Sequence, residues 1–366
     1  MITAEAPAAE ERASAFAERV FNAALEMIDL TTIYLGDQLG YYQALVELGE
    51  ATPAELAERT GTIERYTREW LEQQAVSGIL DVRDTGDPAT RRYSIPPGVD
   101  VALTDRDSLA YVAPLAKQFL GIVPTLPAVI DAFHSGGGVP YEEYTLEMRE
   151  GLAEANRVLF INLLAQEWIP ALPDIHERLL DTRRPARVVD IGCGAGWSSI
   201  AIAQGYPAVR VDGIDLDRES IEAARINAAS VGVDDRVTFH HRDAGDPALA
   251  GTCDVACAFE CIHDMSDPVA TLRAMRDLVG TGGTVLIGDE RVADTFTAPG
   301  DPIERLMYGA SVLHCLPVGM ASEPTAATGT VMRTETLCAY ASEAGFRSVE
   351  VLPIENEVWR FYRLTA

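Results

Sequence analysis

The second half of the chain alternates short apolar runs with segments in which apolar residues recur at helical spacing. Each short run is expected to be a buried strand, because strands of a parallel sheet are covered on both faces. The predicted parallel strands are residues 188–191, 210–214, 237–240, 254–259 and 284–288. This alternation predicts an α/β fold built on a doubly wound, mostly parallel sheet, with a ligand crevice at the carboxyl ends of the strands. Two later runs, 348–353 and 358–364, predict antiparallel strands.

The first part of the chain has a different pattern, with apolar residues at helical spacing from about residue 13 to 50. We expect two helices there, the second broken near Gly36 and Gly40. Thr52, Pro53 and Glu55 then supply a cap, a proline at the first helical position and a capping-box acid, which predicts a helix start. A further helix and a hairpin at 79–95 complete a winged-helix pattern.

These patterns divide the chain into three predicted parts. Residues 1–105 are a mainly helical winged-helix and dimerisation domain, 106–183 a helical linker and lid segment, and 184–366 a Rossmann-like catalytic domain. The triple glycine at 136–138 favours a mobile lid over the active site, because loops with glycine hinges often close over ligands. A plain linker is the alternative.

The first parallel strand runs directly into three glycines, Gly192, Gly194 and Gly196, with Asp190 two residues before the first. A backbone without β-carbons can lie against a nucleoside-sized ligand. The spacing G-x-G-x-G differs from the G-x-G-x-x-G of dinucleotide sites, where a helix N-terminus faces a pyrophosphate. On this motif alone, a nicotinamide or flavin site stays an alternative.

Acidic residues close the next three predicted strands. Asp215 follows the second strand, 23 residues after Gly192, where a carboxylate can accept hydrogen bonds from ribose hydroxyls. Asp243 follows the third strand, in a position to accept from the adenine amine, and Glu260 closes the fourth. Three suitable strand ends in succession favour an adenosyl ligand over solvated turn acids. The predicted cofactor-binding residues are Asp190, Gly192, Cys193, Gly194, Gly196, Asp215, Leu216, Asp243, Ala244 and Glu260.

Charge and lysine content exclude several functions. The formal net charge is −27, whereas nucleic-acid binding draws on Lys and Arg that neutralise phosphates. The helix expected to read DNA carries Glu64, Glu69 and Glu72, so we expect no nucleic-acid partner. Lys117 is the single lysine, and it lies far from the site motifs. Schiff-base, pyridoxal and Tyr-x-x-x-Lys reductase chemistry therefore lack their usual lysine.

Cys253, Cys257 and Cys261 recur every four residues on a predicted strand. This spacing differs from zinc and iron–sulfur patterns, so we expect small core residues and no metal. No uninterrupted apolar run of about 18 residues occurs, and the first residues lack the pattern of a secretion signal. We therefore expect a cytoplasmic protein without a membrane partner.

With these motifs in place, the sequence resembles bacterial class I S-adenosylmethionine (SAM) methyltransferases that carry an N-terminal winged-helix module and are related to small-molecule O-methyltransferases. It is most similar to an actinobacterial group marked by the segments Tyr66–Ala75, Ser135–Pro140 and Cys261–Pro268. The resemblance covers nearly the whole chain. It implies SAM as the cofactor and S-adenosyl-L-homocysteine as its product.

The segment His263–Asp267 is similar to the His-Asp-Trp-Ser-Asp of plant-type O-methyltransferases, whose histidine deprotonates the acceptor hydroxyl. Met265 stands in place of the tryptophan. Independently, His263 follows the fourth strand into the crevice, and histidine can accept a proton near neutral pH. We therefore predict His263 as the catalytic base. A helix-cap or core histidine is the alternative, since Ser266 and Pro268 belong to a plausible helix start.

We expect a SAM-dependent methyltransferase acting on a small, largely apolar or aromatic acceptor, such as a natural product or another secondary metabolite. O-methylation is favoured over N-methylation, and a homodimer is expected through the N-terminal domain. The predicted acceptor-binding residues are Tyr141, Trp168, Tyr308 and His314, with ordinary core packing as the alternative. Competing functions are a SAM-binding winged-helix regulator without catalysis and a nicotinamide-dependent reductase.

Overall fold

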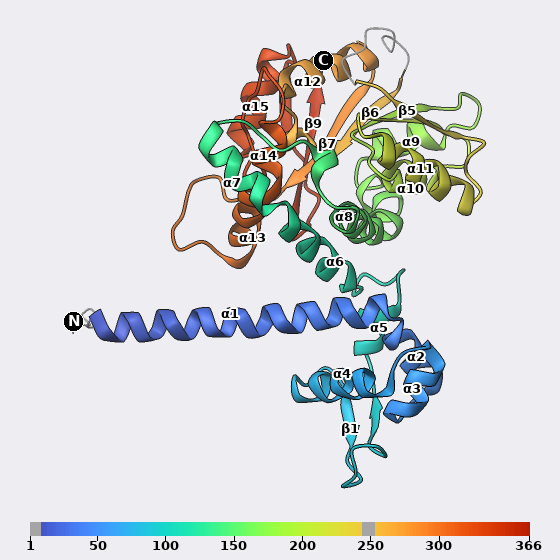
Figure 1. The fold of residues 1–366 in the computed structure, drawn as a ribbon. Coiled ribbons are helices and arrows are strands. Elements are labelled where there is room, and N and C mark those ends of the chain that lie inside the picture. The colour runs from blue at the N-terminus through green and yellow to red at the C-terminus, as the bar shows by residue number, and fades with distance from the viewer. Residues whose placement is uncertain (1–8, 244–252, 281) are drawn as a thin grey trace, which may run out of the picture. The chain divides into compact units, whose positions relative to one another are not determined.

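The computed structural model describes residues 9–243, 253–280 and 282–366. The chain forms two compact units, Met1–Leu120 and Gly121–Ala366, which are both drawn in Figure 1. The predicted linker and lid segment, residues 106–183, is divided between them, with residues 106–120 in the first unit and 121–183 in the second. The domain boundaries at residues 105 and 183 stay predictions.

The N-terminal unit is mainly helical and has the predicted order of helices followed by a hairpin. Its elements are α1 (Ala9–Gln38), α2 (Tyr41–Leu48), α3 (Pro53–Thr60), α4 (Glu64–Val76), β1 (Asp81–Arg83), β2 (Arg92–Ser94) and α5 (Val99–Thr104). The strands β1 and β2 pair in antiparallel fashion. Aromatic residues of α2 pack against Trp70 of α4, with the rings of Tyr41 and Tyr42 at 4.7 and 5.3 Å from it. This winged-helix arrangement confirms the predicted fold of the unit.

Glycines in α1 and after it play different parts. The helix continues through Gly36, where we predicted a break. A β-carbon at Gly36 would lie 2.3 Å from the Trp70 ring, so glycine there allows close packing instead of a turn. The break comes at Gly40, whose φ of 67° is left-handed.

The predicted capping box at the start of α3 is confirmed, because Glu55 N donates to Thr52 Oγ1 and Thr52 N donates to the Glu55 carboxylate.

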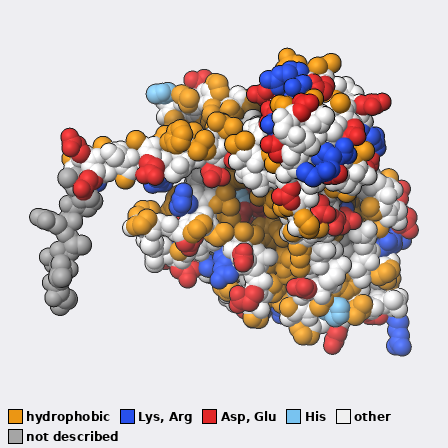
Figure 2. Space-filling model, turned by 90° about the horizontal axis from the view of Figure 1, so that it is seen from below, with side chains coloured by type: hydrophobic (Ala, Val, Ile, Leu, Met, Phe, Trp, Pro, Cys, Tyr) orange, Lys and Arg blue, Asp and Glu red, His pale blue; other side chains and the backbone are white. Residues whose placement is uncertain are grey.

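One face of α1 carries exposed apolar side chains. Phe21, Leu25, Ile28 and Leu35, which we call the α1 stripe, are 63%, 45%, 53% and 46% exposed. Their spacing of four, three and seven residues places them along one side of a helix. Hydrophobic side chains are visible at the surface along α1 in Figure 2.

The C-terminal unit contains a seven-stranded sheet in the order β5-β4-β3-β6-β7-β9-β8. The strands are β3 (Arg187–Ile191), β4 (Arg210–Asp215), β5 (Val237–His241), β6 (Val255–Phe259), β7 (Thr284–Glu290), β8 (Ser348–Val351) and β9 (Trp359–Thr365). The first five pair in parallel, and β9 is antiparallel to both β7 and β8. The predicted mostly parallel sheet is therefore confirmed.

Both faces of this sheet are buried, and Figure 1 shows helices on either side of it. Val188 belongs to one apolar cluster together with side chains of α9 (Pro173–Leu180), α10 (Trp197–Gly205) and α11 (Arg218–Ser230). Its neighbour Val189 belongs to a second cluster with α12 (Pro268–Val279) and α15 (Thr334–Glu343). This explains the uninterrupted apolar runs in the sequence, because successive residues of a strand enter opposite layers of the core.

The remaining helices of the C-terminal unit lie before β3, between β6 and α12, and between β7 and α15. They are η1 (Val123–Thr125), α7 (Leu126–Ser135), η2 (Tyr141–Glu143), α8 (Leu146–Leu159), η3 (Phe160–Trp168), η5 (Ile262–Asp264), α13 (Pro302–Ala310), η6 (Ser311–Cys315) and α14 (Leu316–Gly319). Helix α6 (Ala113–Ile122) spans the division between the two units.

The triple-glycine segment packs closely against another part of the chain. A β-carbon at Gly138 would lie 2.2 Å from Ala321 N and 2.3 Å from Pro317 O. Val139 N also donates to Pro317 O at 2.9 Å. In this structure residues 138 and 139 are thus held against α14, and the lid stays a prediction.

Cys253, Cys257 and Cys261 are buried, with 8%, 1% and 9% exposure, which confirms them as core residues. The thiols of Cys257 and Cys261 face β3, where they donate to Val189 O and Ile191 O.

The continuous helical run Ala113–Ser135 is long and apolar enough to cross a membrane by length and composition, and 39% of its most apolar window is buried. Core helices also meet that criterion, and two prolines at 124 and 127 interrupt this run.

Candidate functional site

The glycine turn after β3 has one position that faces open space. Gly192, Gly194 and Gly196 all have left-handed φ values, of 64°, 50° and 82°. A β-carbon would lie 2.7 Å from Cys261 Sγ at Gly192 and 2.5 Å from the Phe239 ring at Gly196, but at Gly194 it would meet no atom within 4 Å. The outer glycines therefore allow internal packing, and Gly194 is where the backbone can lie against a ligand.

Two acids, the buried Asp190 and the half-buried Asp215, hold this turn in different ways. The Asp190 carboxylate, 1% exposed, accepts hydrogen bonds from the hydroxyls of Ser198 and Ser199 at 2.5 and 2.6 Å, so it anchors the start of α10. Asp215 accepts from Gly194 N and from Asp217 N, each at 2.8 Å. Burial raises the pKa of both carboxyl groups. The structure thus brings Asp215 to the one open glycine, whereas both Asp190 oxygens contact protein groups.

The other predicted cofactor residues lie around the same edge of the sheet. Cys193 is buried in the core beneath the turn, and Leu216, directly after Asp215, is 68% exposed. Asp243 is exposed two residues after β5. Ala244 lies outside the described residues. Glu260 follows β6 with a left-handed φ of 54°, which is uncommon for a residue with a side chain and is often found at functional sites.

His263 lies at the same edge and has a partner that the sequence analysis missed. Its Nδ1 donates to Asp289 Oδ1 at 2.7 Å, and both side chains are 2% exposed. His263 belongs to η5 after β6, and Asp289 is the penultimate residue of β7, the neighbouring strand. Such a carboxylate fixes the tautomer and orientation of an imidazole, leaving Nε2 to take up a proton. The sequence did contain a signal for Asp289, because this residue continues the series of acids at the ends of predicted strands.

The surroundings of His263 control its protonation. Burial alone would lower the pKa of His263. Asp289 and Cys315 raise this pKa by more than burial lowers it, so the net pKa is well above that of an ordinary histidine. Cys315 responds in the opposite way. Burial raises the pKa of its thiol, but His314 and His263 lower it more, to about 5. The Nδ1 of His314 lies 3.4 Å from Cys315 Sγ. The Cys315 thiol and the His263 imidazole therefore shift each other's pKa in opposite directions.

Aromatic rings cover this cluster from the segment after the triple glycine. The rings of Tyr141 and Tyr144 lie 5.8 and 4.6 Å from the His314 ring, both edge-on. Tyr144 also donates its hydroxyl to Leu313 O at 3.0 Å. The predicted residues Tyr141 and His314 are therefore neighbours, and Tyr144 joins them. Nothing in the local sequence distinguished Tyr144 from a core tyrosine.

The other two predicted acceptor-binding residues, Trp168 and Tyr308, pack against other side chains. Trp168 is 3% exposed and packs in the core against Trp359 and Phe361, with ring centroids 5.3 and 4.8 Å away. Tyr308 on α13 is 37% exposed, and its hydroxyl accepts from Arg333 at 3.3 Å. The structure does not bring Trp168 to the His263 cluster.

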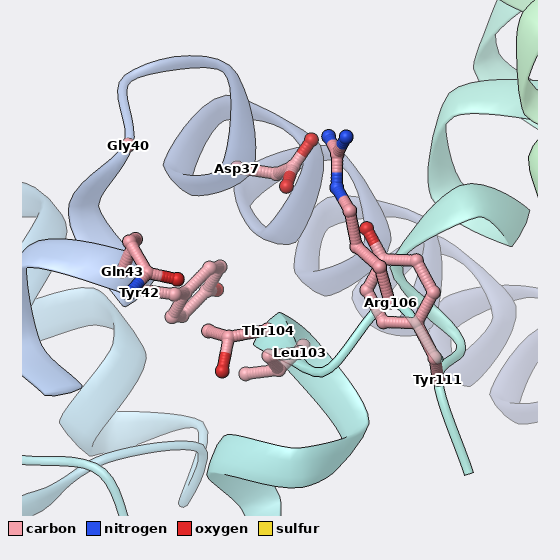
Figure 3. Close-up of a pocket in the computed structure, with 8 residues that line it drawn as sticks. All are labelled: Asp37, Gly40, Tyr42, Gln43, Leu103, Thr104, Arg106 and Tyr111. Carbon is pink, nitrogen blue, oxygen red and sulfur yellow. The ribbon is translucent and has the colours of Figure 1, made fainter. Parts of the chain in front are cut away.

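A small cavity of about 280 Å³ lies in the N-terminal unit (Figure 3). The side chains of Asp37 and Arg106 point toward one another at its edge, and Tyr42, Leu103 and Tyr111 also line it. All of its lining residues precede residue 112, so it belongs to the N-terminal unit alone. In residues 9–243, 253–280 and 282–366, no group of three His, Cys, Asp or Glu side chains is arranged to hold a metal ion.

Two family models match separate parts of the chain. Residues 183–319 match a methyltransferase domain, and residues 28–105 match an Rv2258c-like winged helix-turn-helix domain. The five parallel strands of the sheet and the glycine turn lie in the first region, and α2 to α5 lie in the second.

The chain is also similar to individual proteins. It is 34% identical over 125 residues to the 27-O-demethylrifamycin SV methyltransferase of Amycolatopsis mediterranei, a match covering 34% of this chain and 46% of that enzyme. The chain thus spans about half the length of that relative.

Two solved structures share the fold over almost the whole chain. The mitomycin 7-O-methyltransferase MmcR has a TM-score of 0.69 at 20% identity, covering 98% of this chain and 100% of that one. The O-methyltransferase NcsB1 from neocarzinostatin biosynthesis, in complex with SAM and 2-hydroxy-5-methyl naphthoic acid, has a TM-score of 0.60 at 17% identity, covering 92% and 96%. At these identities the likeness shows a common fold.

Proposed function

Because residues 183–319 are a methyltransferase domain of the class I fold behind a winged helix-turn-helix domain, we propose that this protein transfers a methyl group from SAM to a hydroxyl group of a small acceptor. The observation that carries the proposal is the buried His263–Asp289 pair. It lies at the same edge of the sheet as the glycine turn.

The residues at this edge fit the adenosyl and methionyl parts of SAM. Gly194 offers open backbone, and Asp215 presents a carboxylate beside it that can accept hydrogen bonds from ribose hydroxyls. Leu216 follows β4 and Asp243 follows β5, on the side of β3 where we expect the adenine. Glu260 follows β6, on the other side of β3. Asp190, Cys193, Gly192 and Gly196 shape the turn from beneath. A nicotinamide cofactor is less suited, because the turn lacks the G-x-G-x-x-G spacing.

When bound, SAM supplies an electrophilic methyl group on a sulfonium and leaves as S-adenosyl-L-homocysteine. His263 accepts the proton of the acceptor hydroxyl as the oxygen attacks, and Asp289 holds the imidazole in place and stabilises its cation. Burial excludes water from both side chains and keeps the nucleophile dry. Most of the rate enhancement is expected to come from positioning the two substrates.

We expect the acceptor to be a small, largely apolar or aromatic natural product. The edge-on rings of Tyr141 and Tyr144 around His314 provide an aromatic wall for it. Tyr308 stays a second proposed contact from α13. Support also comes from the relatives, since the rifamycin and mitomycin enzymes are named for O-methylation of natural products.

We further propose that the protein is a cytoplasmic homodimer. A long helix with an exposed apolar stripe is typical of a surface that another chain covers. The α1 stripe has heptad-like spacing, so the partner that fits it is the α1 stripe of a second copy.

A regulator without catalysis is disfavoured by the N-terminal unit. On α4, Arg65 and Arg68 pair with Glu69 and Glu64 of the same helix. Arginines neutralised in this way contribute little to phosphate binding. This supports the prediction that no nucleic acid binds.

The proposal is tested by following isotopically labelled methyl groups from SAM into a panel of phenols, naphthols and amines. We expect label in a hydroxyl-bearing product. Label retained in SAM across the panel, together with tight binding of an operator DNA, would overturn the enzyme assignment and support the regulator.

A further inference from the structure

One buried and one half-buried glutamate meet beside His263, although proton transfer from a hydroxyl does not require them. Glu260 follows β6 and Glu290 ends β7, and these two strands are paired in parallel. Burial raises the pKa of both carboxyl groups, and the charge of Glu260 raises the pKa of Glu290 as well. Glu290 is 4% exposed. Burying two acids in contact is costly unless a positive charge compensates them.

The two carboxyl groups differ in their hydrogen bonding. Asn156 of α8 donates its side-chain amide to Glu260 Oε2. Glu290 Oε2, in contrast, is buried and has no hydrogen-bond partner among the described residues. Buried polar atoms are nearly always paired in native proteins. An unpaired carboxylate oxygen at the carboxyl edge of the sheet therefore points to a ligand that donates to it.

The chain itself supplies little positive charge to this pair. Neither glutamate forms an ion pair with an arginine in the described part of the chain. The positive group that lowers the pKa of both is His263, which already pairs with Asp289. The described residues also hold no cluster arranged for a metal ion. An organic cation that donates hydrogen bonds is the remaining chemistry that matches two carboxyl oxygens.

We propose that the Glu260–Glu290 pair binds a protonated amine of the acceptor, so that the substrates are small molecules carrying both a reactive hydroxyl and a cationic nitrogen. This inference rests on the proposed function, because His263 defines where the hydroxyl lies. Glu290 ends a strand two places from β3, which carries the glycine turn. Glu290 therefore lies on the acceptor side, and Glu260, which follows the intervening strand β6, lies between it and the SAM site. The net charge of −27 also attracts cations to the protein.

Binding of an amine has a distinctive proton balance. Burial raises the pKa of both Glu260 and Glu290, so the empty pair holds a proton more strongly than ordinary glutamates do. An ammonium group favours the form in which both carboxylates are ionised, and that proton is released to solvent. A neutral ligand of the same shape has no such effect.

The test is calorimetry of the full-length protein saturated with S-adenosyl-L-homocysteine. The probes are tyramine and benzylamine, with 4-ethylphenol as the neutral counterpart of tyramine, in buffers of different ionisation enthalpy. We expect tyramine to bind at least about tenfold more tightly than 4-ethylphenol, because its ammonium group donates a charge-assisted hydrogen bond that the neutral probe lacks. Proton release should accompany the two amines only.

Glu290→Gln keeps the shape of the side chain and should abolish both the preference and the proton release, while 4-ethylphenol binding and SAM affinity stay unchanged. Glu355→Gln is the control, because it removes one negative charge at a side chain that is 95% exposed. Equal binding of tyramine and 4-ethylphenol, or no binding of either amine at millimolar concentration, would overturn the inference. So would a Glu290→Gln variant that loses SAM affinity and keeps the amine preference.

These outcomes are separate from those of the proposed function. Methyl transfer to neutral phenols without any amine preference would leave the enzyme assignment standing and reject the amine site. Amine binding with proton release but no methyl transfer to any acceptor would leave the amine site standing and reject the enzyme assignment.

Discussion

At the scale of single residues, Asp215 is the carboxylate best placed to bind the cofactor. It lies within hydrogen-bond distance of Gly194 N, the one open position of the glycine turn. Asp215→Ala should weaken SAM binding roughly 10- to 100-fold, because it removes charge-assisted hydrogen bonds worth about 1.5–3 kcal/mol each. Calorimetry measures this directly, with the melting temperature of the unliganded variant as the control for folding. Unchanged affinity would remove Asp215 from the site.

The pH dependence of catalysis tests the partnership of Asp289 with His263. The neutral imidazole is the active base, so activity should rise as the pH passes the pKa of His263. Asp289 and Cys315 raise that pKa, so the rise should occur at a higher pH than for an ordinary histidine. Asp289→Asn removes one of the two groups that raise the pKa of His263, so the rising limb of kcat/KM should move to lower pH. The value of kcat should also fall, because the imidazole loses the carboxylate that orients it.

Cys315→Ser is the matched comparison for Asp289→Asn. It removes the thiolate but leaves the Asp289 hydrogen bond intact, so it should also move the limb to lower pH, with a smaller loss of kcat. A pH profile that is identical in the parent and both variants would contradict the assignment of His263 as the base.

The residues of the site differ in how far the sequence could reveal them. Asp215 and His263 follow predicted strands, so their position at the sheet edge could be inferred from periodicity alone. Asp289 obeys the same rule and could have been found in this way. Cys315 could not, because it follows His263 by 52 positions and reaches it only through the fold of α13 and η6. The meeting of Glu260 with Glu290 likewise depends on which strands are neighbours.

At the scale of elements, the glycine turn combines backbone strain with ligand contact, and a paired substitution separates the two. Gly194 and Gly136 both have left-handed φ values, 50° and 76°, and at both a β-carbon would meet nothing within 4 Å. Replacing either with Ala should cost about 1–2 kcal/mol of stability through strain. Only Gly194→Ala should also weaken SAM binding, because its β-carbon would occupy the face toward the ligand.

Denaturant unfolding and calorimetry on the two glycine variants provide the comparison. Equal SAM affinity in Gly194→Ala and Gly136→Ala would show that the turn does not contact the cofactor.

Element boundaries show where local sequence is a sufficient guide. The capping box at Thr52 and the parallel strands form as predicted, since each depends on neighbours in sequence or on a simple period. Gly36 was misinterpreted as a helix break because its role is set by the Trp70 ring, which approaches from α4. The same limit applies to Gly138, whose contacts come from residues 317–321.

At the scale of the whole molecule, the α1 stripe predicts a homodimer. Phe21→Glu places a charge in the centre of the stripe, so it should shift the protein toward monomer. Ile226→Glu is the control, because Ile226 is also an exposed apolar residue on a helix, at 69% exposure. Sedimentation velocity distinguishes the two. A parent protein that is monomeric at micromolar concentration, or a Phe21→Glu variant that stays dimeric, would contradict the dimer.

The central claim is that this molecule methylates a hydroxyl with His263 as the base. The most direct test measures methyl transfer from labelled SAM and SAM affinity side by side in the parent and in His263→Ala. We expect the variant to lose roughly 10²–10⁴-fold in kcat, the usual contribution of a general base, while its affinity for SAM stays the same. Full activity in His263→Ala, or a loss of activity explained by lost SAM binding, would contradict the account.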